Sequence, residues 1–446
     1  MIVEQLDMTE TSAEKLTPYL KQLSERPAWR WSGRVVEANA QTIEADGPLC
    51  SVGEGCEIVD GRGIRHRAEV IGFRGRHVVA MPLEGTKGIQ YGDAVLPMGV
   101  APGIAVGVEM TGRIIDALGG PLDSLPTPRA AEVWPLDGGV PQPMERESIQ
   151  EPMQTGIRVL DGMLTVGRGQ RIGIFGGSGV GKSTLIGMMT RNTVADLTVV
   201  GLVGERGREV RDFVEDSLGE EGRKRSVVVV STSDQSPLLR MRAAMAATSV
   251  AEFYANRGKH VLLVLDSLTR YAMAAREVGL AAGEPPATKG YTPSVFTRLA
   301  KLVERAGNFR TGSITAFYTV LMEGDDQQDP VADAVRSLLD GHVVLSRSMA
   351  ASGWYPPVDV LDSLSRLIPS VTTQEHRARA MMVRKLLASY ARSEDLIRIG
   401  AYKPGTDEDL DLAIRAMPSV RAFLEQGSDE RVAMQETVAR LNALEL

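Results

Sequence analysis

The feature that most constrains the fold is a glycine-rich loop between an apolar strand and a helix. Residues 176–183 read GGSGVGKS, with RIGIF before them and TLIGMMTR after them, and they match the pattern G-x-x-x-x-G-K-[ST]. In this context the backbone N–H groups at the start of a helix can surround a phosphate. A glycine-rich turn that binds nothing is the alternative, but it gives no reason for Lys-Ser at the helix start. The loop therefore predicts a nucleotide-binding α/β domain.

The loop also predicts which residues contact the nucleotide. The Lys182 ammonium would lie between the β- and γ-phosphates, and the Ser183 hydroxyl would bind Mg²⁺. ATP and Mg²⁺ are therefore the expected cofactors. The predicted nucleotide-binding residues of the loop and the helix start are Gly176, Gly177, Ser178, Gly179, Val180, Gly181, Lys182, Ser183 and Thr184.

A second oxygen ligand for Mg²⁺ is predicted at the end of a later strand. The run HVLLVLD, residues 260–266, has the form of a buried parallel strand that ends in a carboxylate. Asp266 is therefore the Walker B candidate and the second metal ligand after Ser183. The alternative is that Asp266 serves as the N-cap of the helix that follows. A phosphate-binding loop earlier in the same sheet favours the metal role.

ATP hydrolysis also needs a group that orients or polarises water, and Glu205 is the candidate general base. It follows the apolar run LTVVGLV, at the edge of an open α/β sheet where ligands bind. The alternative is an acidic side chain that is favourable in the first turn of a helix. Glu209 and Asp212 are interpreted as solvent-facing helix charges.

The pattern of apolar runs divides the chain into regions. Residues 1–30 predict an N-terminal helical segment, with a helix from Thr17 to Arg26, and short β-rich runs predict a small barrel over 31–97. Strands alternating with helices over 98–370 predict a RecA-like α/β core with a mostly parallel sheet, which includes a Pro- and Gly-rich linker at 121–152. Helical spacing over 371–446 predicts a C-terminal helical domain.

Charge and cysteine content restrict the classes of partner and the compartment. The net charge of −7 and the pI near 5.5 disfavour a nucleic-acid protein that relies on a broad basic surface. Cys50 and Cys56 form no disulfide framework, and we interpret them as small apolar side chains in a cytoplasmic protein. The N-terminus has no pattern of a secretory signal, and no apolar run is long enough to cross a bilayer. We therefore expect a soluble or peripheral protein.

Four longer motifs show that the sequence resembles the flagellar and type III secretion ATPases, relatives of the catalytic subunits of F-type and V-type rotary ATPases. The resemblance covers nearly the whole chain from about Gly33. It implies a β-barrel, a RecA-like domain and a helical domain arranged as a homohexamer, with ATP at the subunit interfaces. The motifs are VGERGREVRDF, LLVLDSLTRYAMAAREVGLAAGEPPATKGYTPSVF, FYTVLMEGDDQQDPVADAVRSLLDGHVVLSR and YPPVDVLDSLSR.

The resemblance assigns roles that the residues alone would not suggest. Tyr355, in GWYPPVD, would pack on adenine, and Arg366, in DSLSR, would reach the ATP of the next subunit. Arg206 would act beside Glu205 near the γ-phosphate. Taken alone, a tyrosine before two prolines packs a loop and an isolated arginine is a surface charge. Gly177 stands where the family is expected to have alanine, a change that removes no functional group. For Lys182, Ser183, Glu205 and Asp266 the resemblance implies the same roles that their motifs predict.

By the same resemblance, ATP hydrolysis would energise or prime flagellar or type III protein export. The implied partners are a stator-like regulator, a central stalk protein, export chaperone–substrate complexes and an export gate at the inner membrane, where the ATPase would be peripheral. The N-terminal segment would contact the regulator. A catalytic subunit of a rotary ATP synthase and a hexameric RNA translocase are the alternatives. Residues 31–97 show no evident set of aromatic and basic strand residues, which disfavours the translocase.

Overall fold

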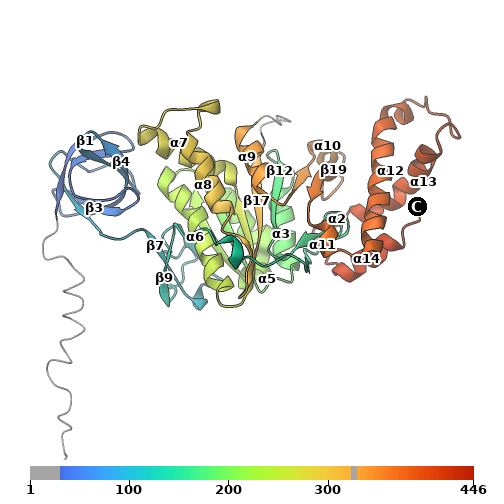
Figure 1. Ribbon diagram of the computed structural model, residues 1–446, viewed down its shortest axis with the longest axis horizontal. Coiled ribbons are helices and arrows are strands. Elements are labelled where there is room, and N and C mark those ends of the chain that lie inside the picture. The colour runs from blue at the N-terminus through green and yellow to red at the C-terminus, as the bar shows by residue number, and fades with distance from the viewer. Residues whose placement is uncertain (1–30, 323–328, 446) are drawn as a thin grey trace, which may run out of the picture. The chain divides into compact units, whose positions relative to one another are not determined.

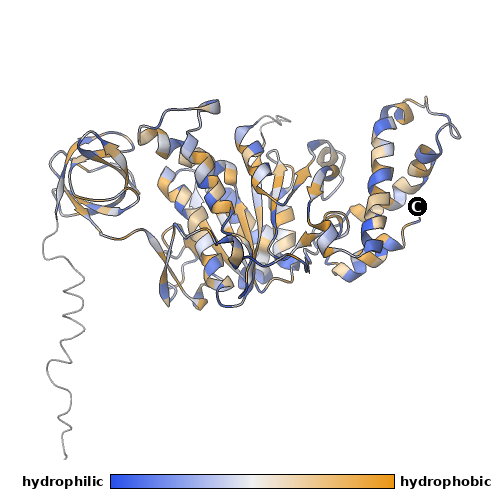
Figure 2. Ribbon diagram, viewed as in Figure 1, coloured by the Kyte–Doolittle hydropathy of each residue, from blue (hydrophilic) through white to orange (hydrophobic). Residues whose placement is uncertain are grey.

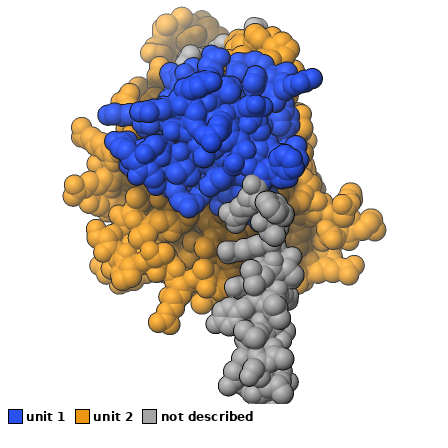
Figure 3. Space-filling view, turned by 90° about the vertical axis from the view of Figure 1, so that its left-hand side faces the viewer, with its two compact units in different colours: residues 1–101 blue, residues 102–446 orange. Residues whose placement is uncertain are grey.

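The computed structural model describes residues 31–322 and 329–445, which fall into two compact units, residues 1–101 and 102–446. Figure 1 shows the elements of each unit and Figure 3 colours the two units separately. The helix predicted from Thr17 to Arg26 lies outside the described residues. Among the described residues, no helix is long and apolar enough to cross a bilayer.

The first unit is a closed six-stranded barrel in the order β1-β2-β5-β4-β3-β6, with each pair antiparallel. Side chains that point inward, such as Val35, Ile43 and Ile58, form its core. Cys56 is buried in this core, Cys50 packs against it, and both thiols are free. The barrel prediction is thus confirmed. The strands are β1 (Gly33–Ala38), β2 (Ile43–Asp46), β3 (Gly55–Val59), β4 (Arg65–Arg74), β5 (His77–Pro82) and β6 (Ala94–Pro97).

The second unit is built on a sheet of nine described strands, ordered β19-β18-β12-β17-β15-β13-β14-β8, with β16 paired to β17. All neighbouring pairs along this order are parallel except β18 and β19. Its strands are β8 (Ile114–Asp116), β12 (Arg171–Gly176), β13 (Leu197–Glu205), β14 (Ser226–Thr232), β15 (His260–Asp266), β16 (Gly307–Asn308), β17 (Ser313–Leu321), β18 (Gly341–Leu345) and β19 (Val358–Ser365).

Burial explains why these strands read as continuous apolar runs rather than alternating ones. Nearly every residue of β13 and β15 is buried, because helices cover both faces of the sheet. Figure 2 shows the apolar strands enclosed by helices. The prediction of a mostly parallel α/β core is confirmed. The helices are α3 (Lys182–Asn192), α4 (Gly207–Asp212), η3 (Phe213–Leu218), α5 (Gly219–Lys224), α6 (Pro237–Ala255), α7 (Leu268–Ala281), α8 (Pro293–Val303), α9 (Pro330–Leu338) and α10 (Arg347–Ala351).

Shorter elements connect these parts. Strand β9 (Glu132–Pro135) pairs with β7 (Gly103–Val106) in a separate two-stranded sheet. The predicted linker at 121–152 contains β9 and a single turn, η2 (Pro143–Glu145). The remaining short elements are η1 (Val108–Met110), β10 (Pro152–Met153), α2 (Arg158–Met163), β11 (Val166–Gly167), η4 (Thr288–Gly290) and α11 (Ile368–Val371).

The C-terminal region is helical, as predicted. It consists of α12 (Gln374–Arg398), α13 (Glu408–Leu424) and α14 (Met434–Asn442). Helices α12 and α13 pack along each other, and α14 packs on α2. Val383, Val420 and Phe423 share one apolar core with Leu160 of α2 and Ile174 of β12. The C-terminal helices are therefore joined to the sheet domain by a continuous core.

Candidate active site

Three predicted functional segments meet at one edge of the large sheet. The glycine-rich loop follows β12, Glu205 ends β13 and Asp266 ends β15. These strands are parallel, so their carboxyl ends lie at the same edge, where ligands bind in open α/β sheets. The strand register also aligns the ends of these strands. Leu202 of β13 pairs with Asp266 of β15, and β17 lies between β12 and β15.

The loop has the backbone shape that its glycines permit. Gly179 and Gly181 have φ values of 76° and 94°, in the left-handed region that favours glycine. Lys182 is buried at the start of α3, and its Nζ donates hydrogen bonds to the carbonyl oxygens of Gly176, at 3.1 Å, and Gly177. Burial lowers the pKa of Lys182, while the nearby carboxylates act in the opposite direction. The lysine charge is thus held inside the loop.

Asp266 and Ser183 supply oxygen atoms of the kind that Mg²⁺ prefers. Asp266 is buried and its Oδ1 accepts a 2.6 Å hydrogen bond from Thr319 Oγ1, while burial raises the pKa of its carboxyl. The Ser183 side chain is exposed in the first turn of α3, which follows the loop. Within the described residues, no three His, Cys, Asp or Glu side chains gather to hold a metal alone. This donor set fits Mg²⁺, which commonly binds one or two protein oxygens together with substrate phosphates.

Glu205 lies in the same cluster, and the pKa of its carboxyl is raised to about 8. Burial raises its pKa most. The hydrogen bond that the protonated Glu205 carboxyl donates to the Glu209 carboxylate and the charge of Asp266 raise the pKa further. The hydrogen bond from Glu205 lowers the pKa of Glu209. Glu209 is exposed as predicted, but its contact with Glu205 was not expected. Asp212 pairs with Arg208 at 3.6 Å on the solvent side, as a solvent-facing charge should.

Arg206 is placed differently from the other predicted residues. It is the N-cap residue of α4, and its side chain is 80% exposed and lies 3.8 Å from a Glu209 carboxylate oxygen. In this structure its guanidinium points to solvent rather than joining Lys182 and Asp266.

Tyr355 lies against the phosphate-binding loop, although about 170 residues separate them in the sequence. A Cβ atom on Gly181 would stand 3.1 Å from Cε2 of the Tyr355 ring, so the absence of a side chain at Gly181 allows this approach. Burial raises the pKa of the Tyr355 hydroxyl, and the neighbouring Thr184 lowers it. The structure thus brings Tyr355 to the loop that sequence reasoning assigned to the nucleotide.

Arg366 lies at the opposite edge of the sheet from the loop of its own chain. It follows β19, which is antiparallel to β18, so it stands where the parallel strands begin. Its backbone N–H donates to the carbonyl oxygen of Asp340, 2.9 Å away and just before β18, and Asp340 also pairs with Arg171 at the start of β12. The Arg366 side chain is exposed. It is therefore far from the cluster around Lys182 within one chain.

Relatives share this sequence over almost its full length. The chain is 52% identical to a flagellum-specific ATP synthase of Pseudomonas aeruginosa, covering 92% of both chains, and 49% identical to one of Bacillus subtilis, covering 92% and 94%. It is 44% identical to a type 3 secretion system ATPase of Xanthomonas euvesicatoria, covering 96% and 98%. The chain belongs to this family of ATPases. The sheet edge described above lies within residues 156–365, which match the nucleotide-binding domain of the ATP synthase alpha/beta family.

Domain models and solved structures agree with this assignment. The β-barrel domain and the nucleotide-binding domain of the ATP synthase alpha/beta family match residues 35–99 and 156–365, and the T3SS EscN ATPase C-terminal domain matches 372–443. The assembled ATPase EscN of the enteropathogenic E. coli type III secretion system superimposes with a TM-score of 0.87 at 42% identity, over 92% of this chain and 98% of EscN. EscN in complex with its central stalk EscO gives 0.85 at 41% identity, with the same coverage.

The structure adds Arg270 to the candidate site of this ATPase, a residue that sequence reasoning missed. Arg270 lies on α7, four residues after Asp266, and its charge lowers the pKa values of both Glu205 and Asp266. Its buried Nε has no hydrogen-bond partner among the described residues. The signal available in the sequence was an arginine in the first turn of the helix that begins just after the strand ending in Asp266.

Within the part of the chain that the structure describes, no backbone contact requires glycine rather than alanine at position 177. A Cβ atom at this position would stand 2.9 Å from Nη2 of Arg347, which is the far end of a flexible and exposed side chain. An alanine there would displace only that guanidinium. This agrees with the expectation that the glycine removes no functional group.

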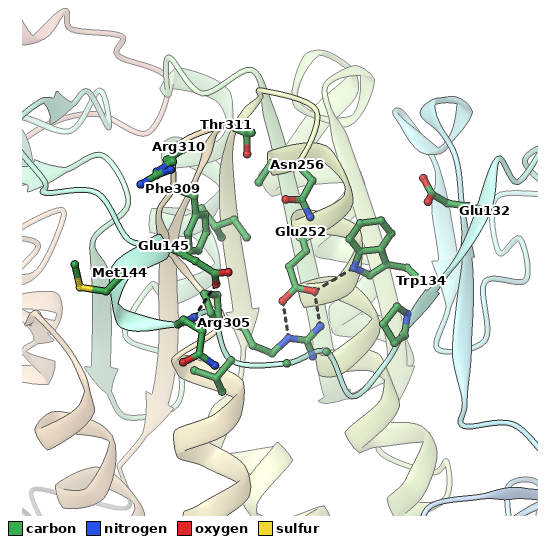
Figure 4. Close-up of a pocket in the computed structure, with 18 of the residues that line it drawn as sticks. Glu132, Trp134, Met144, Glu145, Glu252, Asn256, Arg305, Phe309, Arg310 and Thr311 are labelled. Carbon is green, nitrogen blue, oxygen red and sulfur yellow. Dashed lines mark hydrogen bonds and ion pairs between the residues drawn. The ribbon is translucent and has the colours of Figure 1, made fainter.

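A large pocket of the second unit lies at the other edge of the sheet. Its volume is about 890 Å³, and it is lined by β9, the end of α6 and the start of β17 (Figure 4). Inside it, Arg305 forms two 2.7 Å bonds with the carboxylate of Glu252, and Trp134 donates to Glu252 at 3.2 Å. Arg305 also donates to the carbonyl oxygen of Leu136 and the hydroxyl of Ser249. These charged groups are fully paired, which favours a structural role.

Proposed function

We propose that this ATPase works as a homohexameric ring that energises or primes flagellar or type III protein export, with Mg-ATP bound between protomers. The observation that carries the proposal is the separation of Lys182 and Arg366. The first lies with Glu205 and Asp266 at one edge of the sheet, and Arg366 lies at the opposite edge of the same sheet. A ring of identical chains can bring the two edges together at each interface.

Each residue of the site would have a distinct task. Lys182 binds the phosphates, Ser183 and Asp266 hold Mg²⁺, and Tyr355 packs on adenine. Mg²⁺, when bound, neutralises phosphate charge and helps to position the terminal phosphate. Glu205 polarises the attacking water, with Arg206 and Arg270 as neighbouring charges. Arg366 of one protomer stabilises the charge that develops at the site of the next, as arginine fingers do.

The family assignment supports the partners that we propose. EscN has been solved in complex with its central stalk EscO, and we propose an equivalent stalk for this ring. The other proposed partners are a stator-like regulator that contacts the N-terminal segment, export chaperone–substrate complexes and an export gate, which would make the ring peripheral at the inner membrane. We propose no nucleic-acid partner, so hydrolysis should not respond to added RNA.

The decisive experiment mixes two inactive variants before ring assembly. Glu205→Gln and Arg366→Ala should each abolish most ATP turnover alone. In a mixed ring, an Arg366→Ala protomer that keeps Glu205 can receive Arg366 from a Glu205→Gln neighbour, which rebuilds a complete site. The mixture should therefore regain measurable steady-state ATPase activity, with a maximum near equal proportions of the two chains.

The matched control mixes Glu205→Gln with Lys182→Ala. Both changes damage the same side of the interface, so each protomer keeps a defect in its own nucleotide site and no activity should return. If the first mixture stays inactive while mixed rings are shown to form, or if Arg366→Ala turns over like the unmodified chain, the shared site is wrong.

A further inference from the structure

The segment that carries Tyr355 is attached to the end of helix α13. The carbonyl oxygen of Tyr355 accepts a 2.8 Å hydrogen bond from the backbone N–H of Gln426. Gln426 lies two residues beyond the last residue of α13, Leu424. Tyr355 also lies against Gly181 of the phosphate-binding loop. The segment after α13 and the phosphate-binding loop therefore both contact Tyr355.

The side chain of Gln426 fixes the position of that N–H group. It is 3% exposed, and its Oε1 accepts a 2.7 Å hydrogen bond from the backbone N–H of Arg158. Its Nε2 donates to the carbonyl oxygens of Gly156, at 2.9 Å, and Glu430, at 3.0 Å. Because the amide has partners on both sides, Gln426 is held against the turn that precedes α2.

Arg158 strengthens the same attachment. Its guanidinium is buried, and it donates to the carbonyl oxygens of Phe423, at 2.8 Å, and Glu425, and pairs with Glu430. The segment that follows α13 is therefore bonded on both sides of Gln426. Gln426 and the Arg158 guanidinium are buried and hydrogen bonded, so they couple the position of α13 to the turn before α2.

A second contact joins α13 to the residue before Tyr355. The guanidinium carbon of Arg421 lies 5.1 Å from the centroid of the Trp354 ring, which is within the range of a cation–π interaction. Arg421 also pairs with Glu425 at 2.7 Å, and its side chain is 47% exposed. Arg421 therefore holds the tryptophan from the solvent side while Gln426 holds the tyrosine backbone from inside.

We infer that Gln426 and Arg421 are positioning residues for nucleotide binding, which fix Trp354 and Tyr355 over the phosphate-binding loop and make ATP affinity depend on the position of α13. Their partners include Trp354, Tyr355 and Arg158, so both residues act on the loop through Tyr355. The inference rests on the proposed function, because it takes Tyr355 as the residue that packs on adenine. It adds a route by which a load on the C-terminal helices alters ATP binding.

The test measures ATP hydrolysis and nucleotide binding by the full-length, assembled protein. Arg421→Gln should raise KM for ATP, and the Kd of a fluorescent ATP analogue, about twofold to fivefold, the size of a partly exposed cation–π contact. The value of kcat should stay within about twofold, because the phosphate-side residues are untouched. Arg415→Gln, an exposed arginine on the same helix, is the matched control and should change neither value.

Gln426→Glu tests the buried half of the attachment. It replaces the Nε2 donor with an oxygen that faces two carbonyl oxygens, so KM should rise about tenfold. The thermal unfolding midpoint without nucleotide is measured in parallel, because this change also destabilises the fold. Arg421→Gln lies on the surface and keeps the inference testable if Gln426→Glu fails to fold.

Tyr355→Ala separates this inference from the proposed function. If both residues act through Tyr355, Arg421→Gln should add nothing to KM in the Tyr355→Ala background. If Tyr355→Ala raises KM but Arg421→Gln does not, or if the two effects multiply, the positioning role is wrong and the adenine role stands. If Tyr355→Ala itself leaves KM unchanged, the adenine role is wrong and the inference fails with it.

Discussion

The two edges of the large sheet hold charged clusters that differ in how well their charges are neutralised. At the amino-terminal edge, Arg305 and Glu252 line a roomy pocket and are fully hydrogen bonded to each other. At the carboxyl edge, burial raises the pKa values of Glu205 and Asp266 and lowers that of Lys182. Incompletely compensated charges of this kind favour the carboxyl edge as the reactive one, where the proposed Mg-ATP would complete the set. The size of a cavity is no guide to the reactive edge here, because the large pocket lies at the other edge.

The largest expected effect comes from removing the lysine ammonium group at the carboxyl edge. Lys182→Ala should reduce ATP turnover below detection and weaken ATP binding about tenfold to a hundredfold, since a charged hydrogen-bonding partner of the phosphates is lost. Steady-state ATPase assays and titration with a fluorescent ATP analogue check both effects. Lys259→Ala, an exposed lysine that pairs with Asp196 at 3.8 Å, should leave both unchanged. Normal turnover in Lys182→Ala would remove the basis of the comparison.

Replacing the candidate base should separate binding from chemistry at the same edge. Glu205→Gln keeps the shape of the side chain but removes its ability to accept a proton, so kcat should fall about 10²-fold to 10⁴-fold with nucleotide affinity retained. Single-turnover hydrolysis and the Kd of the ATP analogue measure the two quantities. Glu215→Gln, at an exposed position on η3, is the control. A fall in affinity without a fall in kcat would assign Glu205 to binding instead.

The paired edge should respond in stability and leave catalysis unchanged. Glu252→Gln strands a buried Arg305, whose side chain is 3% exposed, and should lower the free energy of unfolding by about 3–5 kcal/mol. KM for ATP should stay within error, as shown by steady-state kinetics beside denaturant unfolding. Glu132→Gln breaks an ion pair with Arg257 in which both side chains are 40% exposed, and should cost less than about 1 kcal/mol. A shift of KM in Glu252→Gln would mean that the pocket belongs to the nucleotide site.

The smallest expected effect is a shift in pH dependence. Glu209 raises the pKa of Glu205 through a hydrogen bond and through its charge. Glu205 acts as a base only when deprotonated, so activity falls as pH drops through its pKa. Glu209→Gln should lower that pKa and move the acid limb of the kcat/KM profile to lower pH. The profile is compared with that of the unmodified chain at the same free Mg²⁺. An acid limb that moves to higher pH would contradict the pairing.

The sequence by itself determined the fold class, and it placed the residues of the proposed phosphate-binding half of the site. Gly181, Lys182 and Ser183 stand at the start of α3, where the motif predicts them, and a buried strand that ends in Asp266 is visible as an apolar run. The parallel arrangement then placed Glu205 at the same edge without further information. Local patterns suffice here because each residue's position follows from the element that it begins or ends.

The tertiary structure alone decided which distant residues meet. Arg270 and Glu209 face Glu205 through packing of α7 and α4 at the ends of their strands, and Gln426 bonds Gly156 across 270 residues of sequence. The position of Arg366 at the opposite edge follows from β19 running antiparallel to its neighbour, which no periodicity encodes. Such contacts depend on how elements stack around a common core, and helical or strand spacing carries no record of that order.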